Sequence, residues 1–313
     1  MNRLIDYAGL FPPANLNLAQ AFNNFIMYLQ GEYSWGLSRF IIPAKRLPEL
    51  TELMGQMKYP GDINLPFSIL GTNPESIKDF EKHLEQDIKL IGEFRDKFGS
   101  RIQADIIEMR LPADAFEGSS KDMSALMKTV SDNFKDKLNM NVTAFYEAAL
   151  KGDFENRVVK ATEAISLFNG KQRNAGFKLR TGGVEASTFP TPEEISFALV
   201  TCIEYDVPMK CTAGLHHPIR HYDESVQTNM HGFLNVFGAG IFAQVCNLDV
   251  DETLQILTEE DPYAFHFTKD GIEINDFVVP NKDLELSRKK FMLSYGSCSF
   301  DDPVNDLKTM ELL

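Results

Sequence analysis

The chain has 313 residues, of which 43% are hydrophobic and 24% are charged, and its formal net charge is −14. These values are ordinary for a globular protein with a large core, and the acidic balance opposes binding to nucleic acid and to anionic membranes, both of which favour basic surfaces. The four cysteines form no C-x-x-C pair, and neither a signal-peptide pattern nor an apolar stretch long enough to span a bilayer is present. We therefore expect a cytoplasmic protein with free thiols and with no nucleic-acid or membrane partner.

Short apolar runs alternate with helix-like segments along the chain, as expected for βα units around a parallel sheet. The predicted strands cover residues 4–11, 37–42, 65–71, 102–109, 142–147, 176–183, 207–214 and 291–300. Predicted helices begin near residue 18, run through 47–53, extend from about 73 to 94, begin at 191, cover 233–245 and begin again at 303.

Eight such units predict an α/β fold, a closed (β/α)8 TIM barrel that forms one domain over residues 1–313. The predicted seventh and eighth strands are separated by an insertion at about 222–290, in which Asp270-Gly271 predicts a hairpin turn. An open doubly wound sheet is the main competitor, but such a sheet usually carries a glycine-rich nucleotide loop after its first strand. Here that place is taken by residues 11–14, Phe-Pro-Pro-Ala.

Two lysines occupy successive predicted strands that both end in glycine. Lys178 lies in Gly-Phe-Lys-Leu-Arg-Thr-Gly-Gly, and Lys210 lies in Met-Lys-Cys-Thr-Ala-Gly. Lysine is rarely buried unless it is paired. If both side chains point into the barrel, a second ammonium lowers the pKa of the first, and a neutral amine can attack a carbonyl. In the alternative interpretation, either lysine forms an ion pair with Asp105, Glu108 or Glu147 and merely fills the barrel mouth.

Further polar residues could share this site. Because side chains alternate along a strand, Lys178 and Arg180 lie on one face, and Arg180 could hold an anionic substrate group. The strand at 102–109 offers a carboxylate for proton transfer, either Asp105 or Glu108, but these lie on opposite faces, so only one can point inward. Asp6, on the first strand, is a third candidate, as a substrate-binding residue.

The sequence resembles the deoxyribose-phosphate aldolases and related class I aldolases, strand by strand over most of the chain. Residues 4–12 are similar to that family's opening strand, residues 178–182 to its Schiff-base strand, and residues 210–214 to its second-lysine strand. Asp105 matches the position of the family's proton-relay aspartate. Residues 295–299, Tyr-Gly-Ser-Cys-Ser, look like its phosphate-binding end.

The resemblance implies a role for each matching residue. Lys178 would form the imine, Lys210 would lower its pKa, and Asp105 would move protons. The end of the last strand would bind the anionic part of the substrate through Gly296, Ser297 and Ser299. The chain departs from the family at residues 215–218, Leu-His-His-Pro, and in the long insertion.

Histidines form a second cluster in the sequence. His216, His217, His221 and His231 lie close together, although the whole chain has only 6 histidines. We expect His216 and His217 to contact substrate or to act in acid–base chemistry. An alternative is a metal site made by His216, His217 and His231, since a catalytic zinc needs about three protein ligands and an open position.

These observations predict a class I aldolase-like carbon–carbon lyase. The enzyme would act on a small phosphorylated or carboxylated carbonyl substrate through a lysine Schiff base, without a cofactor or metal. A homo-oligomer is left open. The alternatives are a metal-dependent barrel lyase or hydrolase that uses the clustered histidines, and a non-catalytic barrel that binds a small anion.

Overall fold

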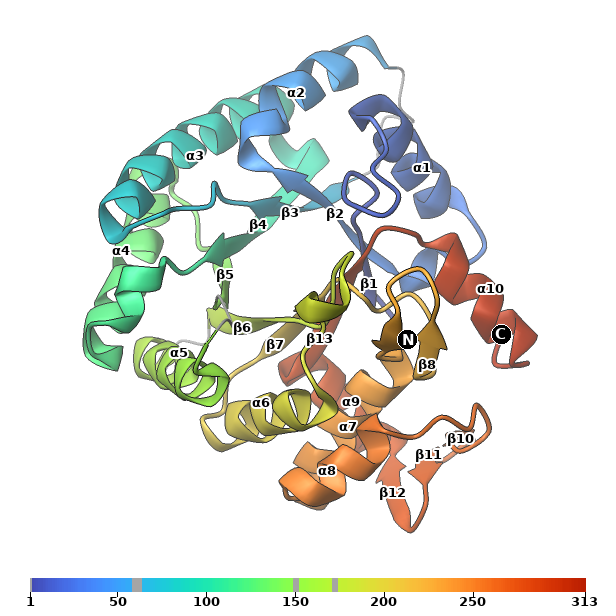
Figure 1. Ribbon diagram of the computed structural model, residues 1–313. Helices are drawn as coiled ribbons and strands as arrows, with labels where there is room; N and C mark the ends of the chain where they lie inside the picture. The colour runs from blue at the N-terminus through green and yellow to red at the C-terminus, as the bar shows by residue number, and fades with distance from the viewer. Residues whose placement is uncertain (1, 58–63, 149–151, 171–173) are drawn as a thin grey trace.

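Eight parallel strands close into a barrel in the computed structural model, which describes residues 2–57, 64–148, 152–170 and 174–313 (Figure 1). Around the barrel the strand order is β1-β13-β7-β6-β5-β4-β3-β2. The bounds are β1 (Ile5–Tyr7), β2 (Leu37–Pro43), β3 (Leu65–Leu70), β4 (Ile102–Arg110), β5 (Thr143–Glu147), β6 (Ala175–Arg180), β7 (Met209–Thr212) and β13 (Met292–Ser297). The predicted closed α/β barrel is confirmed, and each predicted strand overlaps one of these.

Helices surround the strands on the outside of the barrel (Figure 1). Their bounds are α1 (Leu18–Gln30), α2 (Leu47–Gln56), α3 (Ile77–Phe98), α4 (Ser120–Leu138), α5 (Phe154–Asn169), α6 (Pro192–Glu204), α7 (Phe233–Cys246), α8 (Val250–Leu257), α9 (Asn281–Lys290) and α10 (Asp301–Thr309). Short 3-10 turns occur at Ser34–Gly36, Ala44–Arg46, Gly99–Arg101, Ala113–Phe116 and Ala186–Thr188. None of the helices in the described ranges is both long and apolar enough to cross a membrane.

Local sequence explains where several helices begin. The Thr191 side chain caps α6 in a capping box with Glu194, and Pro192 occupies the first helical turn, where its missing N–H costs nothing. The helix predicted from about residue 73 instead begins at Ile77, because Ser76 supplies the N-cap oxygen by accepting a hydrogen bond from the Asp79 backbone N–H.

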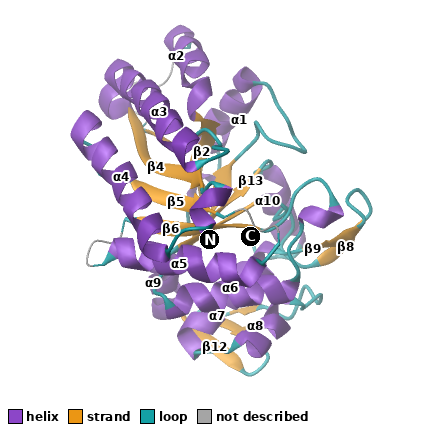
Figure 2. Cartoon of the chain, turned by 60° about the vertical axis from the view of Figure 1, so that its left-hand side comes forward, coloured by secondary structure: helices purple, strands orange, loops and turns teal. Residues whose placement is uncertain are grey.

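The insertion lies between β7 and β13, as predicted. It contains an antiparallel pair, β8 (His221–Asp223) and β9 (Thr228–Met230), and a three-stranded sheet, β10 (His266–Phe267), β11 (Gly271–Ile274) and β12 (Phe277–Pro280), next to α7 and α8 (Figure 2). β10 and β11 are antiparallel neighbours joined through Asp270-Gly271, so the predicted hairpin is confirmed. Every residue of α7 from Phe233 to Ala243 is buried, as expected for a helix that is apolar on all sides.

The barrel separates an apolar outer layer from a polar interior. Large aromatic side chains, among them Phe40 and Phe67, pack between the strands and the surrounding helices. A second group of strand residues is buried although its members are polar or charged: Asp6, Ser68, Glu108, Glu147, Lys178, Lys210 and Ser294. Burying this many polar groups would strongly destabilise the fold unless they form hydrogen bonds and ion pairs with one another.

Candidate active site

Lys178 and Lys210 face each other across neighbouring strands. Their Cα atoms are register partners in the parallel β6–β7 pair, and their side chains are 7% and 4% exposed. Both amines bind the same carboxylate: Lys178 Nζ lies 2.9 Å from Glu108 Oε2, and Lys210 Nζ lies 2.7 Å from Glu108 Oε1. The two lysines therefore reach a common interior site, but Glu108 of β4 bridges them.

Each lysine also has a carboxylate partner of its own. Lys178 Nζ lies 2.9 Å from Glu147 Oε2, and Lys210 Nζ lies 2.8 Å from Asp6 Oδ2. Arg180 extends the chain of ion pairs, because its Nε donates a hydrogen bond of 3.1 Å to Glu147 Oε1. Three carboxylates thus balance three cations, counting Arg180, across β1, β4, β5, β6 and β7.

Two serines complete the hydrogen bonding of the buried carboxylates. Ser68 Oγ donates to Glu108 Oε1 at 2.5 Å, and Ser294 Oγ donates to Asp6 Oδ2 at 2.6 Å. Neither serine was among the residues predicted for the site. The available signal was a serine inside a largely apolar strand, Ser68 in Leu65–Leu70 and Ser294 in Met292–Ser297, because a buried hydroxyl needs a partner.

The carboxylates determine the charge state of the lysines. Burial by itself would lower the pKa of Lys178, but the negative charges of Glu108 and Glu147 outweigh burial and raise it above the ordinary lysine value. Burial likewise lowers the pKa of Lys210, but the negative charges of Asp6 and Glu108 outweigh burial, so this pKa is also raised. For Glu108, burial opposes the charged form, but the two lysines hold its pKa below the ordinary value.

These shifts correct one expectation. The proximity of two lysines predicted a lowered pKa for Lys178, because like charges repel. The intervening Glu108 reverses that result, so that Lys178 is an ammonium ion in the free protein.

A cavity opens on this cluster at the carboxyl ends of the strands. It has a volume of about 290 Å³, at the small end of the range typical of ligand pockets. Lys178 lines it, whereas the deeper Lys210 does not. The other lining residues are Ala8, Phe11, Pro12, Ile41, Leu70, Glu108, Arg180, Gly183, Val184, Thr188, Thr212, Ala213, His216, Gly296 and Cys298.

An adjoining hollow of about 490 Å³ shares part of this lining. Lys178, Arg180 and Glu108 contribute to both spaces, and Glu147 lines the second. Lys178 is thus the lysine of the cluster that a small molecule in the mouth could reach.

Glycines at the ends of the lysine strands let the backbones of β6 and β7 come together. A Cβ atom at Gly182 would lie 2.9 Å from Gly214 Cα, and Gly214 has φ +76°, a conformation that favours glycine. Thr181 Oγ1 donates a hydrogen bond of 2.6 Å to the Ala213 carbonyl. These contacts fix the two strand ends, and with them the positions of the lysines.

The structure places Asp105 away from the lysines, contrary to the resemblance. Its Oδ1 lies 2.8 Å from Arg39 Nη1, its side chain is 44% exposed, and Gln103 Nε2 donates to its Oδ2. Asp105 and Glu108 point to opposite sides of β4, as strand alternation requires, and Glu108 is the one that points inward.

The expected anion-binding residues are only partly available to a ligand. Gly296 lines the mouth cavity. Ser297 is buried and its Oγ accepts a long hydrogen bond from the Ser299 backbone N–H, while Ser299 Oγ accepts from the Asp302 N–H at 3.1 Å. Asp301 and Asp302 also occupy the first turn of α10, where their charge opposes anion binding. Arg180, whose side chain is 46% exposed, is the better-placed cation for an anionic group.

The predicted histidines point to three different places. His216 lines the mouth cavity, its Nδ1 lies 3.8 Å from Cys298 Sγ, and burial together with neighbouring His217 lowers its pKa. His217 Nδ1 instead lies 2.7 Å from Asp306 Oδ2. His231 is buried and its Nε2 bonds the Pro190 carbonyl. The alternative metal site of His216, His217 and His231 is therefore not assembled.

His231 is expected to make the protein sensitive to acid. Burial lowers its pKa to about 4, so the folded state binds this proton less readily than the unfolded chain does. The resulting stability is present above the unfolded pKa, about 6.5, and is lost as the pH falls toward 4. Between pH 7 and pH 4, we expect the free energy of unfolding of the wild type to fall by roughly 3 kcal/mol more than that of His231→Gln, as measured by urea unfolding. Equal losses in both proteins would contradict this, and His266→Gln, at an exposed histidine, is the control.

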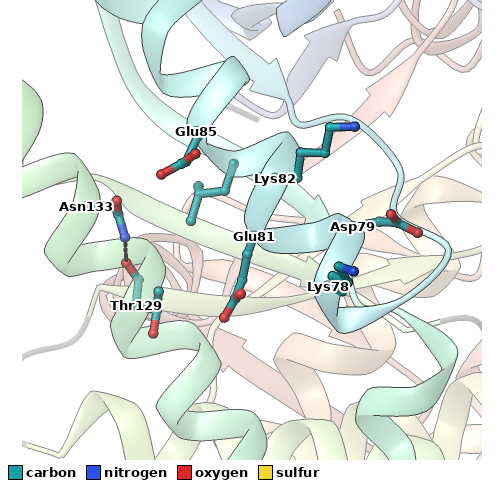
Figure 3. A pocket seen from close by; sticks show the side chains of 8 residues that line it. Lys78, Asp79, Glu81, Lys82, Glu85, Thr129 and Asn133 are labelled. Carbon is teal, nitrogen blue, oxygen red and sulfur yellow. Dashed lines mark hydrogen bonds between the residues drawn. The ribbon is translucent and has the colours of Figure 1, made fainter.

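A larger hollow lies on the outside of the barrel. It measures about 660 Å³ and is lined by side chains of α3 and α4, including Lys78, Lys82, Glu85 and Asn133 (Figure 3). Its charges are mixed, and it shares no residue with the two spaces at the barrel mouth. The buried ion-pair cluster makes the mouth the better candidate for chemistry.

No family model matches the sequence, and no curated protein matches it either. Among solved structures, the chain is similar to QR15, an aldolase, with 12% sequence identity and a TM-score of 0.43 over 67% of this chain and 80% of that one. It is also similar to deoxyribose phosphate aldolase from Aeropyrum pernix, with 10% identity and a TM-score of 0.42 over 69% of this chain and 79% of that one. A third similar structure is that of the IOLI protein, which holds a zinc atom; the identity is 12% and the TM-score 0.42, over 81% of this chain and 95% of that one. The expected likeness to deoxyribose-phosphate aldolases is confirmed as a distant structural similarity.

Proposed function

We propose that this protein is a barrel enzyme that binds a small carbonyl compound as an imine on Lys178 and makes or breaks a carbon–carbon bond next to it. The supporting observation is the position of Lys178. Lys178 lines the mouth cavity, and its amine lies 2.9 Å from carboxylate oxygens of both Glu108 and Glu147.

The paired carboxylates favour the intermediate as well as the resting amine. An ammonium at Lys178 loses one proton to solvent, and the amine lone pair then attacks the carbonyl carbon. The adduct takes up a proton and loses water to give an iminium ion. Since the iminium carries the same single positive charge as the ammonium, Glu108 and Glu147 stabilise both. When the bond between the α and β carbons breaks, a base takes the proton of the β-hydroxyl and the β carbon leaves as a carbonyl compound. The iminium accepts the electron pair of the broken bond and becomes an enamine.

The surrounding residues have distinct roles in this proposal. Glu147 lines the outer hollow beside Lys178 and is placed to carry protons between substrate and solvent. Lys210 positions Glu108 through their ion pair, and Lys210 itself does not line the cavity. Arg180, which lines both spaces, binds a carboxylate or phosphate group of the substrate, and His216 offers a neutral ring to the same cavity.

The pH dependence of imine formation tests this mechanism. Because the pKa of Lys178 is raised, the fraction of neutral amine grows about tenfold with each pH unit up to pH 10. Because the loss of water that follows addition takes up a proton, we expect the initial rate of reductive trapping with a reactive aldehyde to rise from pH 7 to pH 10 by at most about tenfold per pH unit. The measurement is intact-protein mass after timed exposure to aldehyde and cyanoborohydride, at saturating reductant.

Two results would count against the proposal in different ways. A plateau below pH 8 would show that the pKa of Lys178 is lowered in the free protein, contrary to the ion-pair geometry. The absence of any adduct over the whole pH range, with a broad panel of aldehydes and ketones, would contradict imine chemistry itself. Trapping on exposed lysines is subtracted with the Lys178→Arg variant at each pH.

A further inference from the structure

A second group of chemically capable side chains lies in the segment that follows β7. His217, His221 and Asp223 each place one potential metal-binding atom within 4.8 Å of the others, the one such group in the described ranges. The two imidazole rings are perpendicular, with centroids 4.6 Å apart, and His221 Nε2 lies 4.0 Å from Asp223 Oδ2. None of these three residues lines the lysine cavity.

The hydrogen bonds of this group leave the right atoms available. His217 Nδ1 lies 2.7 Å from Asp306 Oδ2, and His221 Nδ1 lies 3.0 Å from the Ile219 carbonyl. Both partners are acceptors, so each Nδ1 carries the hydrogen in the neutral ring and each Nε2 keeps a lone pair. Metal-binding histidines are typically oriented in this way, because the ring nitrogen that does not bind the metal donates its hydrogen to a carboxylate or a backbone carbonyl.

Asp223 is oriented in a similar way. Its Oδ1 accepts hydrogen bonds from the Ser225 backbone N–H, at 2.7 Å, and from Ser225 Oγ, at 2.5 Å. These bonds fix the carboxylate and leave Oδ2, the oxygen nearer His221, for another partner.

We propose that His217 Nε2, His221 Nε2 and Asp223 Oδ2 form a binding site for a divalent transition metal, with Zn²⁺ as the best match and solvent as the fourth ligand. Two imidazoles and one carboxylate are a donor set that suits zinc. Tetrahedral zinc requires donor atoms about 3.3 Å apart, which small side-chain rotations would supply here. The three side chains are 40%, 35% and 25% exposed, so the site is open to entry from solvent.

The site would connect separate parts of the insertion and the C-terminal helix. His221 and Asp223 belong to β8, and Asp306, which orients His217, belongs to α10, the helix drawn next to β8 in Figure 1. His216, the residue before His217, lines the mouth cavity. Metal binding would therefore fix the loop that presents His216, without taking part in the lysine chemistry.

Isothermal titration of the chelator-treated full chain with Zn²⁺ tests the site. We expect about one equivalent to bind with a micromolar or lower Kd, and His221→Ala and Asp223→Ala each to weaken binding at least about tenfold. His266→Ala, which removes an exposed histidine outside the group, should bind like the wild type. No binding by the wild type, or equal binding by all four proteins, would overturn the proposal.

Co²⁺ provides a second readout that does not depend on how the variants fold. Bound to the wild type, it should give visible d–d bands without a thiolate-to-cobalt charge-transfer band, since no cysteine belongs to the proposed donor set. A strong charge-transfer band would place the metal on a thiol such as Cys298, beside His216, and would contradict the proposed ligands. Either result leaves the imine chemistry of Lys178 untouched, because that is measured without metal.

Discussion

Glu108→Gln is expected to lower the free energy of unfolding by about 3–5 kcal/mol. The substitution keeps the shape of the side chain but removes the negative charge that Lys178 and Lys210 share. Two buried ammonium ions would then repel each other with only Glu147 and Asp6 as carboxylate partners. Loss of one member from a buried ion-pair network is costly because it leaves charge without compensation. The measurement is urea unfolding at pH 7.

The matched control lies on the same strand. Asp105 forms one ion pair, with Arg39, and is 44% exposed, so Asp105→Asn should cost less than about 1 kcal/mol. If Asp105→Asn destabilised the protein as much as Glu108→Gln, the assignment of Glu108 as the bridging carboxylate would be wrong. Far-UV circular dichroism of both variants establishes that they fold before unfolding is compared.

Lys178→Arg is expected to abolish the borohydride-trapped adduct on the peptide that carries residue 178, leaving only the background from exposed lysines. Arginine keeps a positive charge between Glu108 and Glu147 but cannot form an imine under these conditions, since its guanidinium stays protonated. Retention of the charge separates the chemical effect from the structural one. The measurement is the adduct fraction on the peptide that carries residue 178, at a fixed pH.

Lys210→Arg is the matched comparison for this prediction. Lys210 lies below the cavity and contacts Asp6 and Glu108, so a cation there can still hold Glu108. We expect adduct yield within about tenfold of the wild type, on Lys178. An adduct that disappears in Lys210→Arg but persists in Lys178→Arg would exchange the roles of the two lysines.

The closed barrel could be predicted from sequence because its determinants are local. Eight apolar runs separated by helix-like segments identify βα units, and Thr191-Pro192 and Asp270-Gly271 mark a helix start and a hairpin turn. The register between strands is not local. Strand alternation established that Asp105 and Glu108 face opposite ways, but not which of them faces inward. The resemblance to aldolases selected Asp105, and the structure places Glu108 there instead.

The electrostatics of the site could not be predicted, because they depend on barrel closure. Ser294 and Asp6, 288 residues apart in sequence, share a hydrogen bond since β13 pairs with β1. Lys210 thereby receives a carboxylate from the first strand in addition to Glu108. Sequence spacing showed two lysines on adjacent strands and suggested repulsion, whereas the folded chain places a carboxylate between them. The sequence identified both lysines, but the inward-facing carboxylate, the two serines and the sign of the pKa shift required the fold.

Peptide-level mapping of reductive trapping is the most direct test of the central proposal. The full chain is treated with a panel of small aldehydes and ketones, including phosphorylated and carboxylated ones, then with borohydride, and is digested and sequenced by mass spectrometry. We predict a single major adduct on Lys178, with Lys210 unmodified because it does not line the cavity. No adduct with any compound, or modification only of exposed lysines, would contradict the proposal that Lys178 forms an imine.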